Sequence, residues 1–252
     1  MSLQNIINLP FPDLDMVLVE GGEFMMGDEM GDLWEACRPV HPVSVSSFYM
    51  AKFPVTQRLY QAVMGESPSS FKGDLRPVET VSWDDAQEFI EKLNAKKAVE
   101  DFLKKLDPPG KAFRLPTEAE WEFAARGGRL PTASTKYAGS DNEKEVAWYD
   151  ENSYDETKAV GLKLPNELGL HDMSGNVWEW CEDDWLNKYD QAPADGSAWL
   201  DSPERGDSRV QRGGSYFHYP ENCRAAFRSD DWPEYRDDDI GFRLALSPQF
   251  SP

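Results

Sequence analysis

His218 carries the side chain best suited to acid–base chemistry in the C-terminal part of the chain. An unperturbed imidazole titrates at about pH 6.5, so it can accept or donate a proton near neutrality. Phe217 and Tyr219 flank this histidine, however. Aromatic neighbours favour a second interpretation, in which His218 is one ligand-contact residue among several. The sequence leaves both roles open.

Three cysteines, Cys37, Cys181 and Cys223, have side chains that can act as nucleophiles or metal ligands. Their odd number and the lack of a Cys-x-x-Cys spacing support neither a disulfide framework nor a zinc site. We therefore expect three buried thiols that pack as small apolar side chains.

Aromatic and short polar side chains surround His218, and residues 212–246 form a candidate variable binding region. Aromatic rings supply large, stiff contact areas, and short polar side chains add hydrogen bonds at a small cost in entropy. We predict that residues 216–239 form an exposed and roughly continuous binding face. The candidate ligand-binding residues are Tyr216, Phe217, His218, Tyr219, Asn222, Phe227, Ser229, Asp230, Asp231, Trp232, Tyr235, Asp237, Asp238 and Asp239.

Composition excludes several classes of partner. The formal net charge of -20 argues against nucleic acid and against an anionic membrane surface, because both attract basic proteins. No apolar run approaches the roughly 20 residues of a membrane span. Residues 1–15 lack the pattern of a secretory leader. We expect an exported or cell-surface protein if a leader has been removed, and a cytoplasmic one otherwise.

Three amphipathic helices are predicted in the first half of the chain. Thr56 caps the first, which ends at Gly65, and Ser82 caps the second. Thr117 and Glu120 form a capping box at the start of the third. We expect all three helices to serve as scaffold.

The other elements of the first half are predicted to be strands and loops. Met16–Val19 and Phe24–Met26 flank two glycines and are expected to form a hairpin or a bulge, and Val43–Met50 a further strand. The charged stretch Lys96–Gly110 is expected to be an exposed loop. No internal repeat or linker is apparent, so we expect a single domain over residues 1–252.

Several long motifs carry a resemblance to a known family. Residues 113–126 read FRLPTEAEWEFAAR, residues 168–180 read LGLHDMSGNVWEW, and Arg212–Ser215 and Gly241–Arg243 follow in order. Together they resemble the formylglycine-generating-enzyme, or sulfatase-modifying factor, domain family. The resemblance implies an α+β, C-type-lectin-like fold with short twisted sheets, about three packed helices and much ordered loop. It also implies a ligand surface near the C-terminus.

The resemblance also implies a calcium ion held by oxygen ligands. Asn176 and Glu179 offer hard side-chain oxygens, and a backbone carbonyl such as that of Val177 could complete the set. In the alternative, Asn176 and Glu179 only satisfy buried backbone groups. A second calcium position of the family would need an acid where this chain has Gly161. The calcium ion is an optional cofactor, and no other is expected.

Catalysis is where the chain departs from the enzymes that it resembles. The resemblance implies two cysteines, five positions apart, that hold copper and exchange with the substrate thiol. Here the first of these positions falls on His218, and Cys223 lies near the second. One thiol cannot form the paired thiolate site that copper(I) selects. An oxidative enzyme of the formylglycine-generating type, acting on a protein cysteine or a small thiol, is therefore the alternative.

The C-terminal segment resembles another subset of the family, the variable proteins of diversity-generating retroelements, more than it resembles the enzymes. The resemblance implies substitution at adenines in AAY codons, which can yield Phe, Tyr, His, Asn, Asp, Ser or Ala but never Trp, Glu, Gln, Lys or Met. From Phe217 to Asp239, every candidate residue except Trp232 belongs to this reachable set. Glu221, Trp232 and Glu234 do not, and are expected to be fixed framework.

Four arginines, Arg224, Arg228, Arg236 and Arg243, are expected to brace this segment by binding carbonyls and carboxylates of neighbouring loops. The run Asp237–Asp239 is either simply solvated or a rim that prefers basic or hydroxyl-bearing partners. We interpret the chain as a non-catalytic recognition protein. A protein ligand is expected, with a carbohydrate as the alternative, because fold does not settle the ligand class.

Overall fold

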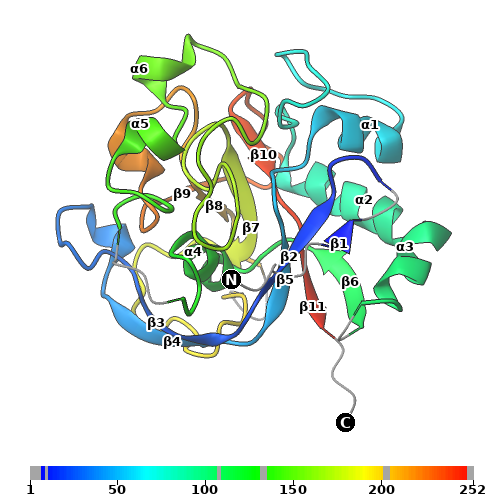
Figure 1. Cartoon of the computed structure of the whole chain (residues 1–252). Coiled ribbons are helices and arrows are strands. Elements are labelled where there is room, and N and C mark those ends of the chain that lie inside the picture. Colours follow the sequence, from blue (N-terminus) through cyan, green and yellow to red (C-terminus); the bar gives the residue numbers. More distant parts are fainter. Residues whose placement is uncertain (1–6, 9–10, 107–108, 131–134, 201–204, 249–252) are drawn as a thin grey trace.

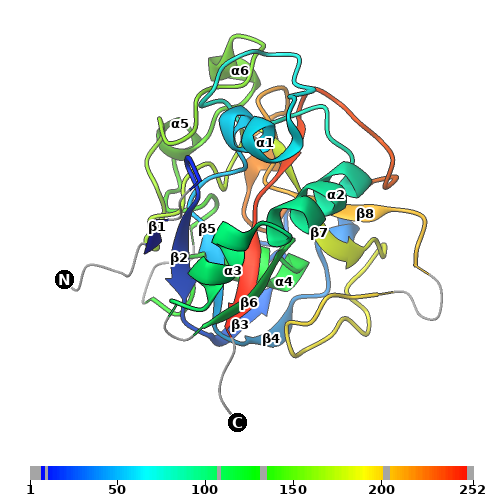
Figure 2. The same ribbon diagram turned by 90° about the vertical axis from the view of Figure 1, so that its right-hand side faces the viewer.

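The computed structural model describes residues 7–8, 11–106, 109–130, 135–200 and 205–248. These residues form eleven strands and six α-helices, with 3-10 turns at Glu35–Cys37 and Pro220–Cys223 (Figures 1 and 2). The strands are β1 (Ile7–Asn8), β2 (Asp15–Val19), β3 (Gly22–Met26), β4 (His41–Val45), β5 (Phe48–Ala51), β6 (Gly110–Arg114), β7 (Trp178–Asp184), β8 (Arg209–Arg212), β9 (Arg228–Asp231), β10 (Ile240–Phe242) and β11 (Ala245–Pro248). The helices are α1 (Gln57–Met64), α2 (Trp83–Asn94), α3 (Lys97–Leu103), α4 (Glu118–Ala125), α5 (Glu143–Val146) and α6 (Asp150–Ser153). The mixture confirms the predicted α+β class.

An antiparallel sheet of five strands, in the order β1-β2-β5-β11-β6, contains strands from both ends of the described chain. All four residues of β5 are buried, and they alternate between two cores. Tyr49 and Ala51 point into one core, and Phe48 and Met50 into the other. A strand covered on both faces reads as a continuous apolar run, which explains its weak alternation in the sequence.

Helices α1, α2 and α3 cover one face of this sheet, on the right of Figure 1. The predicted caps are confirmed: the Thr56 and Ser82 side chains accept hydrogen bonds from the backbone NH groups of Leu59 and Asp85, and Gly65 ends α1 in the left-handed region. The prediction of an exposed loop over Lys96–Gly110 is wrong, since α3 occupies residues 97–103. Residues 107–108 lie outside the described chain.

The opposite face carries α4 and the ribbon formed by β3 and β4. Of the two predicted alternatives for Met16–Val19 and Phe24–Met26, a hairpin or a bulge, the hairpin is wrong, because β2 pairs with β5 whereas β3 pairs with β4. The chain changes sheets at Gly21, where a Cβ atom would lie 2.5 Å from the Val45 carbonyl oxygen. The single strand predicted over Val43–Met50 is also wrong. β4 ends at Val45 and pairs with β3, whereas β5 begins at Phe48 and belongs to the five-stranded sheet.

A second large sheet, in the order β10-β7-β8-β9, positions the C-terminal segment. β7 runs parallel to β10 and antiparallel to β8, and β8 pairs with β9. The two loops between β8 and β9 and between β9 and β10 contain most of the predicted binding residues. Within the described part of the chain, no helix is long and apolar enough to cross a membrane.

Candidate binding site

Buried ion pairs fix the strands of the second sheet. Arg228, in β9, donates two hydrogen bonds of 2.8 Å to the Glu118 carboxylate at the start of α4, and neither side chain is more than 3% exposed. Arg243 pairs in the same way with Glu179 of β7. Arg224 and Arg236 lie nearer the surface, where they bind Asp32 and Asp85. All four predicted framework arginines therefore brace neighbouring segments.

Two glycines turn the chain from β8 into the first loop. Gly213 and Gly214 have φ values of 97° and 73°, a region that residues with a Cβ atom rarely adopt. At Gly214 a Cβ atom would lie 2.8 Å from the sulfur of Cys223. The double glycine thus lets Ser215 and the residues after it cross the end of the sheet.

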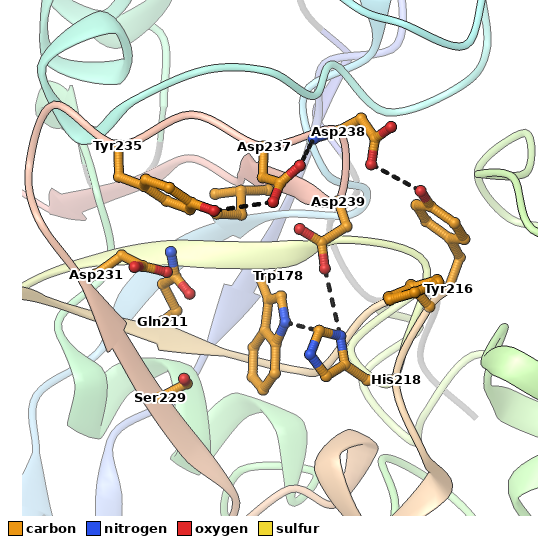
Figure 3. A pocket seen from close by; sticks show the side chains of 12 residues that line it. Trp178, Gln211, Tyr216, His218, Ser229, Asp231, Tyr235, Asp237, Asp238 and Asp239 are labelled. Atoms are coloured by element: carbon orange, nitrogen blue, oxygen red, sulfur yellow. Dashed lines mark hydrogen bonds and ion pairs between the residues drawn. The ribbon is translucent and has the colours of Figure 1, made fainter.

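A pocket of about 570 Å³ opens where the two loops meet β7 and β8 (Figure 3). We call it the acidic pocket. Nine of the fourteen predicted ligand-binding residues line it: Tyr216, Phe217, His218, Ser229, Asp231, Tyr235, Asp237, Asp238 and Asp239. Trp178, Gln211 and Ile240 complete the lining. The sequence did not indicate these three, because they lie outside the aromatic and polar clusters of the two loops.

His218 is held at one side of the acidic pocket by a small polar network. Its Nδ1 lies 2.7 Å from Ser215 Oγ and 3.3 Å from both Asp239 Oδ2 and Trp178 Nε1, and Ser215 Oγ donates to Asp239 Oδ2 at 2.7 Å. In a Ser-His-Asp hydrolase the serine and the aspartate use opposite ring nitrogens. Here both use Nδ1, so the arrangement does not activate the serine and instead fixes the ring orientation.

Four aspartates supply the negative charge of the lining. Asp237 accepts a hydrogen bond from the Tyr235 hydroxyl at 3.0 Å, and Asp238 accepts one from the Tyr216 hydroxyl at 2.8 Å. Burial, followed by the neighbouring charge of Asp230, raises the pKa of Asp231 to about 6. Among the described residues that line the pocket, none is Lys or Arg. The pocket is therefore negatively charged and rich in hydrogen-bond acceptors.

The predicted binding residues range from exposed to buried, so they do not all lie on one exposed face. Phe217, Tyr219 and Trp232 are 64%, 69% and 61% exposed. Tyr216 and Asp239 are buried, contrary to the expected exposure, because their polar atoms bond to Asp238 and Ser215 within the pocket wall.

The other five predicted residues do not line the acidic pocket. Phe227 is half-buried against the rings of Trp34 and Trp178, and Asn222 and Asp230 are half-buried. Tyr219 lines a separate hollow of about 360 Å³ with Asp150 and Asp155, and this hollow shares Phe217 and His218 with the acidic pocket. Trp232 lines a third, of about 560 Å³.

The residues predicted to hold calcium already have partners. Both carboxylate oxygens of Glu179 accept hydrogen bonds from Arg243 at 2.6 Å, and one also accepts from Trp121 Nε1. Asn176 Oδ1 accepts from the Lys158 backbone NH at 2.9 Å, and Val177 is buried beside it. A carboxylate neutralised by an arginine does not fit a calcium ion. The contacts of Asn176 match the alternative, in which it satisfies buried backbone groups, whereas Glu179 accepts from the Arg243 and Trp121 side chains instead.

The three cysteines are free and buried, as predicted. Burial raises the pKa of the Cys37 thiol to about 11, and it raises those of Cys181 and Cys223 further. A thiol with a raised pKa is protonated near neutrality, and the thiolate is the reactive form. None of the three is therefore poised for thiol chemistry in this conformation.

Comparison with known proteins places the chain in a family. A family model described as the sulfatase-modifying factor enzyme 1-like domain matches residues 9–248. The chain is 35% identical over 242 residues to the chaperone protein LppX of Paenibacillus barcinonensis, covering 80% of this chain and 78% of that protein. It is 30% identical over 301 residues to the formylglycine-generating enzyme of Streptomyces coelicolor, with 91% and 88% covered.

A solved structure extends this likeness to three dimensions. Treponema denticola variable protein 1 superposes with a TM-score of 0.78 at 31% identity, covering 98% of this chain and 100% of that one. The similarity confirms the predicted fold and the predicted resemblance to variable proteins. The chain therefore belongs to the sulfatase-modifying factor enzyme 1-like domain family.

Proposed function

We propose that this protein is a non-catalytic ligand-binding protein that presents a variable binding face, residues 212–246, on its C-type-lectin-like scaffold. One observation carries the proposal. Residues of the types reachable from AAY codons converge on the acidic pocket and its rim, whereas the arginines between them are engaged with the scaffold: Arg228 is buried against Glu118, and Arg224 and Arg236 pair with Asp32 and Asp85. Along β9, for example, Arg228 is fully buried while Ser229 and Asp231 line the pocket.

This separation supports diversification because one set of residues stabilises the backbone and a different set contacts the ligand. Buried ion pairs such as Arg228 with Glu118 and Arg243 with Glu179 hold the backbone whatever occupies the surface positions. Changes at exposed positions usually alter stability by less than about 0.5 kcal/mol. The likeness to Treponema denticola variable protein 1, over 98% of the chain, supports the same function.

The proposed ligand is a protein. Phe217, Tyr219 and Trp232 expose most of their ring surfaces, and exposed aromatic rings are typical anchors of protein interfaces. A carbohydrate would also stack on aromatic rings and donate hydrogen bonds from its hydroxyl groups to the carboxylates. A glycan array that shows specific binding at the acidic pocket would therefore replace the protein ligand with a sugar.

Sequencing this gene in many isolates of the source organism tests the diversification. We expect substitutions to concentrate at codons of the predicted reachable set, except at Phe227, whose ring packs on Trp34 and Trp178, with Arg212, Arg228 and Arg243 unchanged. Trp232, which no AAY codon can reach, should also stay constant and serves as an internal control. Substitutions spread evenly along the gene would contradict the proposal.

The enzymatic alternative deserves its own test, since the chain is 30% identical to a formylglycine-generating enzyme. Incubation with copper and a Cys-x-Pro-x-Arg peptide, followed by mass spectrometry, detects conversion of the peptide thiol to an aldehyde. We expect no aldehyde, because Cys223 is a single buried thiol. Turnover that disappears in a Cys223→Ala variant would establish the enzyme instead.

A further inference from the structure

The acidic pocket indicates what the ligand presents to it. We infer that in this variant the pocket binds a guanidinium group, presented by an arginine side chain of the protein ligand. The inference rests on the proposed ligand-binding function and adds its chemical class. Three features of the pocket carry it: an excess of negative charge, aromatic walls, and a buried amide that lacks a partner.

The negative charge of the acidic pocket is not neutralised by a lysine or arginine among its described lining residues. Asp231, Asp237, Asp238 and Asp239 all contribute to the lining, and no Lys or Arg is among the described residues that line it. The nearby arginines are already engaged: Arg228 binds Glu118, and Arg236 binds Asp85. Carboxylates that are clustered in a hollow attract a cation more strongly than the same charges spread over a surface. The formal net charge of -20 adds long-range attraction.

Aromatic rings face the same space as the carboxylates. Trp178, Tyr216, Phe217 and Tyr235 line the pocket, and Figure 3 shows Trp178 across from the loop that carries Asp237 and Asp239. The face of an aromatic ring attracts a cation, most strongly where water is excluded. A pocket that combines carboxylates with ring faces therefore suits a cation that is flat and partly apolar.

Gln211 is the observation that is independent of the charges. Its side chain is 1% exposed, lines the pocket, and has an Nε2 atom without a hydrogen-bond partner of normal geometry. The amide lies close enough to Asp231 to lower the pKa of that carboxyl in part, against the larger effect of burial. This Nε2 is a donor, so it requires an acceptor, which a guanidinium lacks and which a backbone carbonyl of the arginine-bearing peptide would supply.

Geometry favours a guanidinium over an ammonium group. A guanidinium is planar, carries five NH donors in a fork that matches carboxylates, and stacks on aromatic rings. An ammonium is compact and strongly hydrated, so it gains less from ring faces. The volume of about 570 Å³ leaves room for the side chain that bears the group. The adjoining hollow beyond Phe217, lined by Asp150 and Asp155, offers a path for the rest of a peptide.

Titration of short blocked peptides tests this inference directly. The probes are Ac-Gly-Arg-Gly-NH2, the same peptide with lysine, and the same peptide with citrulline, which keeps the shape of arginine but lacks its charge. Binding is followed by calorimetry and by the change in the intrinsic tryptophan fluorescence of the protein. We expect the arginine peptide to bind at least about tenfold more tightly than either of the others. Equal affinity for arginine and citrulline, or for arginine and lysine, would overturn the inference.

Variants locate the binding. Asp231→Asn removes one charge without changing shape, and Phe217→Ala removes a ring that is 64% exposed, so both variants should remain folded. Each should weaken the arginine peptide by about tenfold. Asp207→Asn is the matched control, because this exposed aspartate lines the third hollow and not the acidic pocket. The inference fails if Asp207→Asn weakens binding as much as Asp231→Asn.

Two further results separate the inference from its premise. Agmatine supplies a guanidinium without a peptide, and tighter binding of agmatine than of the arginine peptide would assign the site to a small molecule. If the gene varies among isolates but no arginine peptide binds, the inference is wrong while the proposed function stands. If the peptide binds but the gene does not vary, the diversification is wrong and the guanidinium site stands.

Discussion

Arg243 and Glu179 form an ion pair that is wholly buried in the second sheet. Arg243 donates from Nε and Nη2 to the two carboxylate oxygens at 2.6 Å, and neither side chain has exposed surface. Arg243 also donates to the backbone carbonyls of Ala51 and His171. The pair therefore fixes β7, and with it Trp178 at the edge of the acidic pocket, against the end of β10 and the first sheet.

Breaking this pair should destabilise the protein strongly. Arg243→Met leaves the Glu179 charge buried without its partner, and removing one member of a buried pair costs about 3–5 kcal/mol. Urea denaturation measures the change in the free energy of unfolding. Arg236→Met is the control, because its partner Asp85 lies nearer the surface, and we expect a loss below about 1 kcal/mol there. Equal losses in the two variants would contradict the structural role of the buried pair.

Calcium should not stabilise this protein through Glu179. The Arg243 guanidinium already occupies both oxygens of that carboxylate, and a second cation beside it would be repelled. Among the described residues there is also no group of three or more His, Cys, Asp or Glu side chains placed to hold a metal. We expect the same melting temperature with millimolar calcium as with a chelator. A rise with calcium that is absent in Asn176→Ala would restore the predicted site.

The helices were predictable because their signals are local. Thr56, Ser82 and Thr117 each bond to backbone groups within three residues, so the sequence alone contains both partners. Helix α3 was missed because the longer stretch Lys96–Gly110 is rich in charged residues, while Val99, Phe102 and Leu103 pack into a core whose other residues lie far away in the sequence.

The sequence could not predict that Gln211 and Trp178 line the acidic pocket, because their neighbours there lie far away in the sequence. Gln211 lies in the middle of a buried strand, and Trp178 resembles the other core tryptophans. Only the pairing of β7 with β8 and β10 brings these two residues against the C-terminal loops. The composition of the loops identified what the site is made of, whereas long-range strand pairing determines which of those residues meet.

The cysteines should be inert in the folded protein. Burial raises the pKa of the Cys37 thiol to about 11, and Cys181 and Cys223 are buried as well. We expect no reaction with Ellman's reagent at mildly alkaline pH until denaturant unfolds the chain, when all three thiols should react. Fast labelling of the native protein, located at Cys223 by peptide mapping, would revive the enzymatic alternative.

Asp231 should make stability depend on pH in an unusual direction. Its pKa is raised from 3.8 to about 6 by burial and by the charges of Asp230, Asp239 and Asp237. Between these two values the folded protein binds more protons at this group than the unfolded chain does. Stability from this group is therefore lost as the pH rises through that window. We expect Asp231→Asn to melt at a higher temperature than the parent protein above pH 6 and at the same temperature below the lower pKa.

Alanine variants of Phe227 and Tyr219 should differ in stability, because Phe227 packs in the framework and Tyr219 lies on the binding face. The Phe227 ring stacks on Trp34 with centroids 5.9 Å apart and also contacts Trp178, whereas Tyr219 is 69% exposed. We expect Phe227→Ala to lower the free energy of unfolding by about 2 kcal/mol, below the 3–5 kcal/mol of a fully buried ring, and Tyr219→Ala to change it by less than about 0.5 kcal/mol. Urea denaturation of both variants measures the difference. Because a diversified position must tolerate exchange, equal and large losses would remove Tyr219 from the binding face, whereas a stable Phe227→Ala variant would return Phe227 to it.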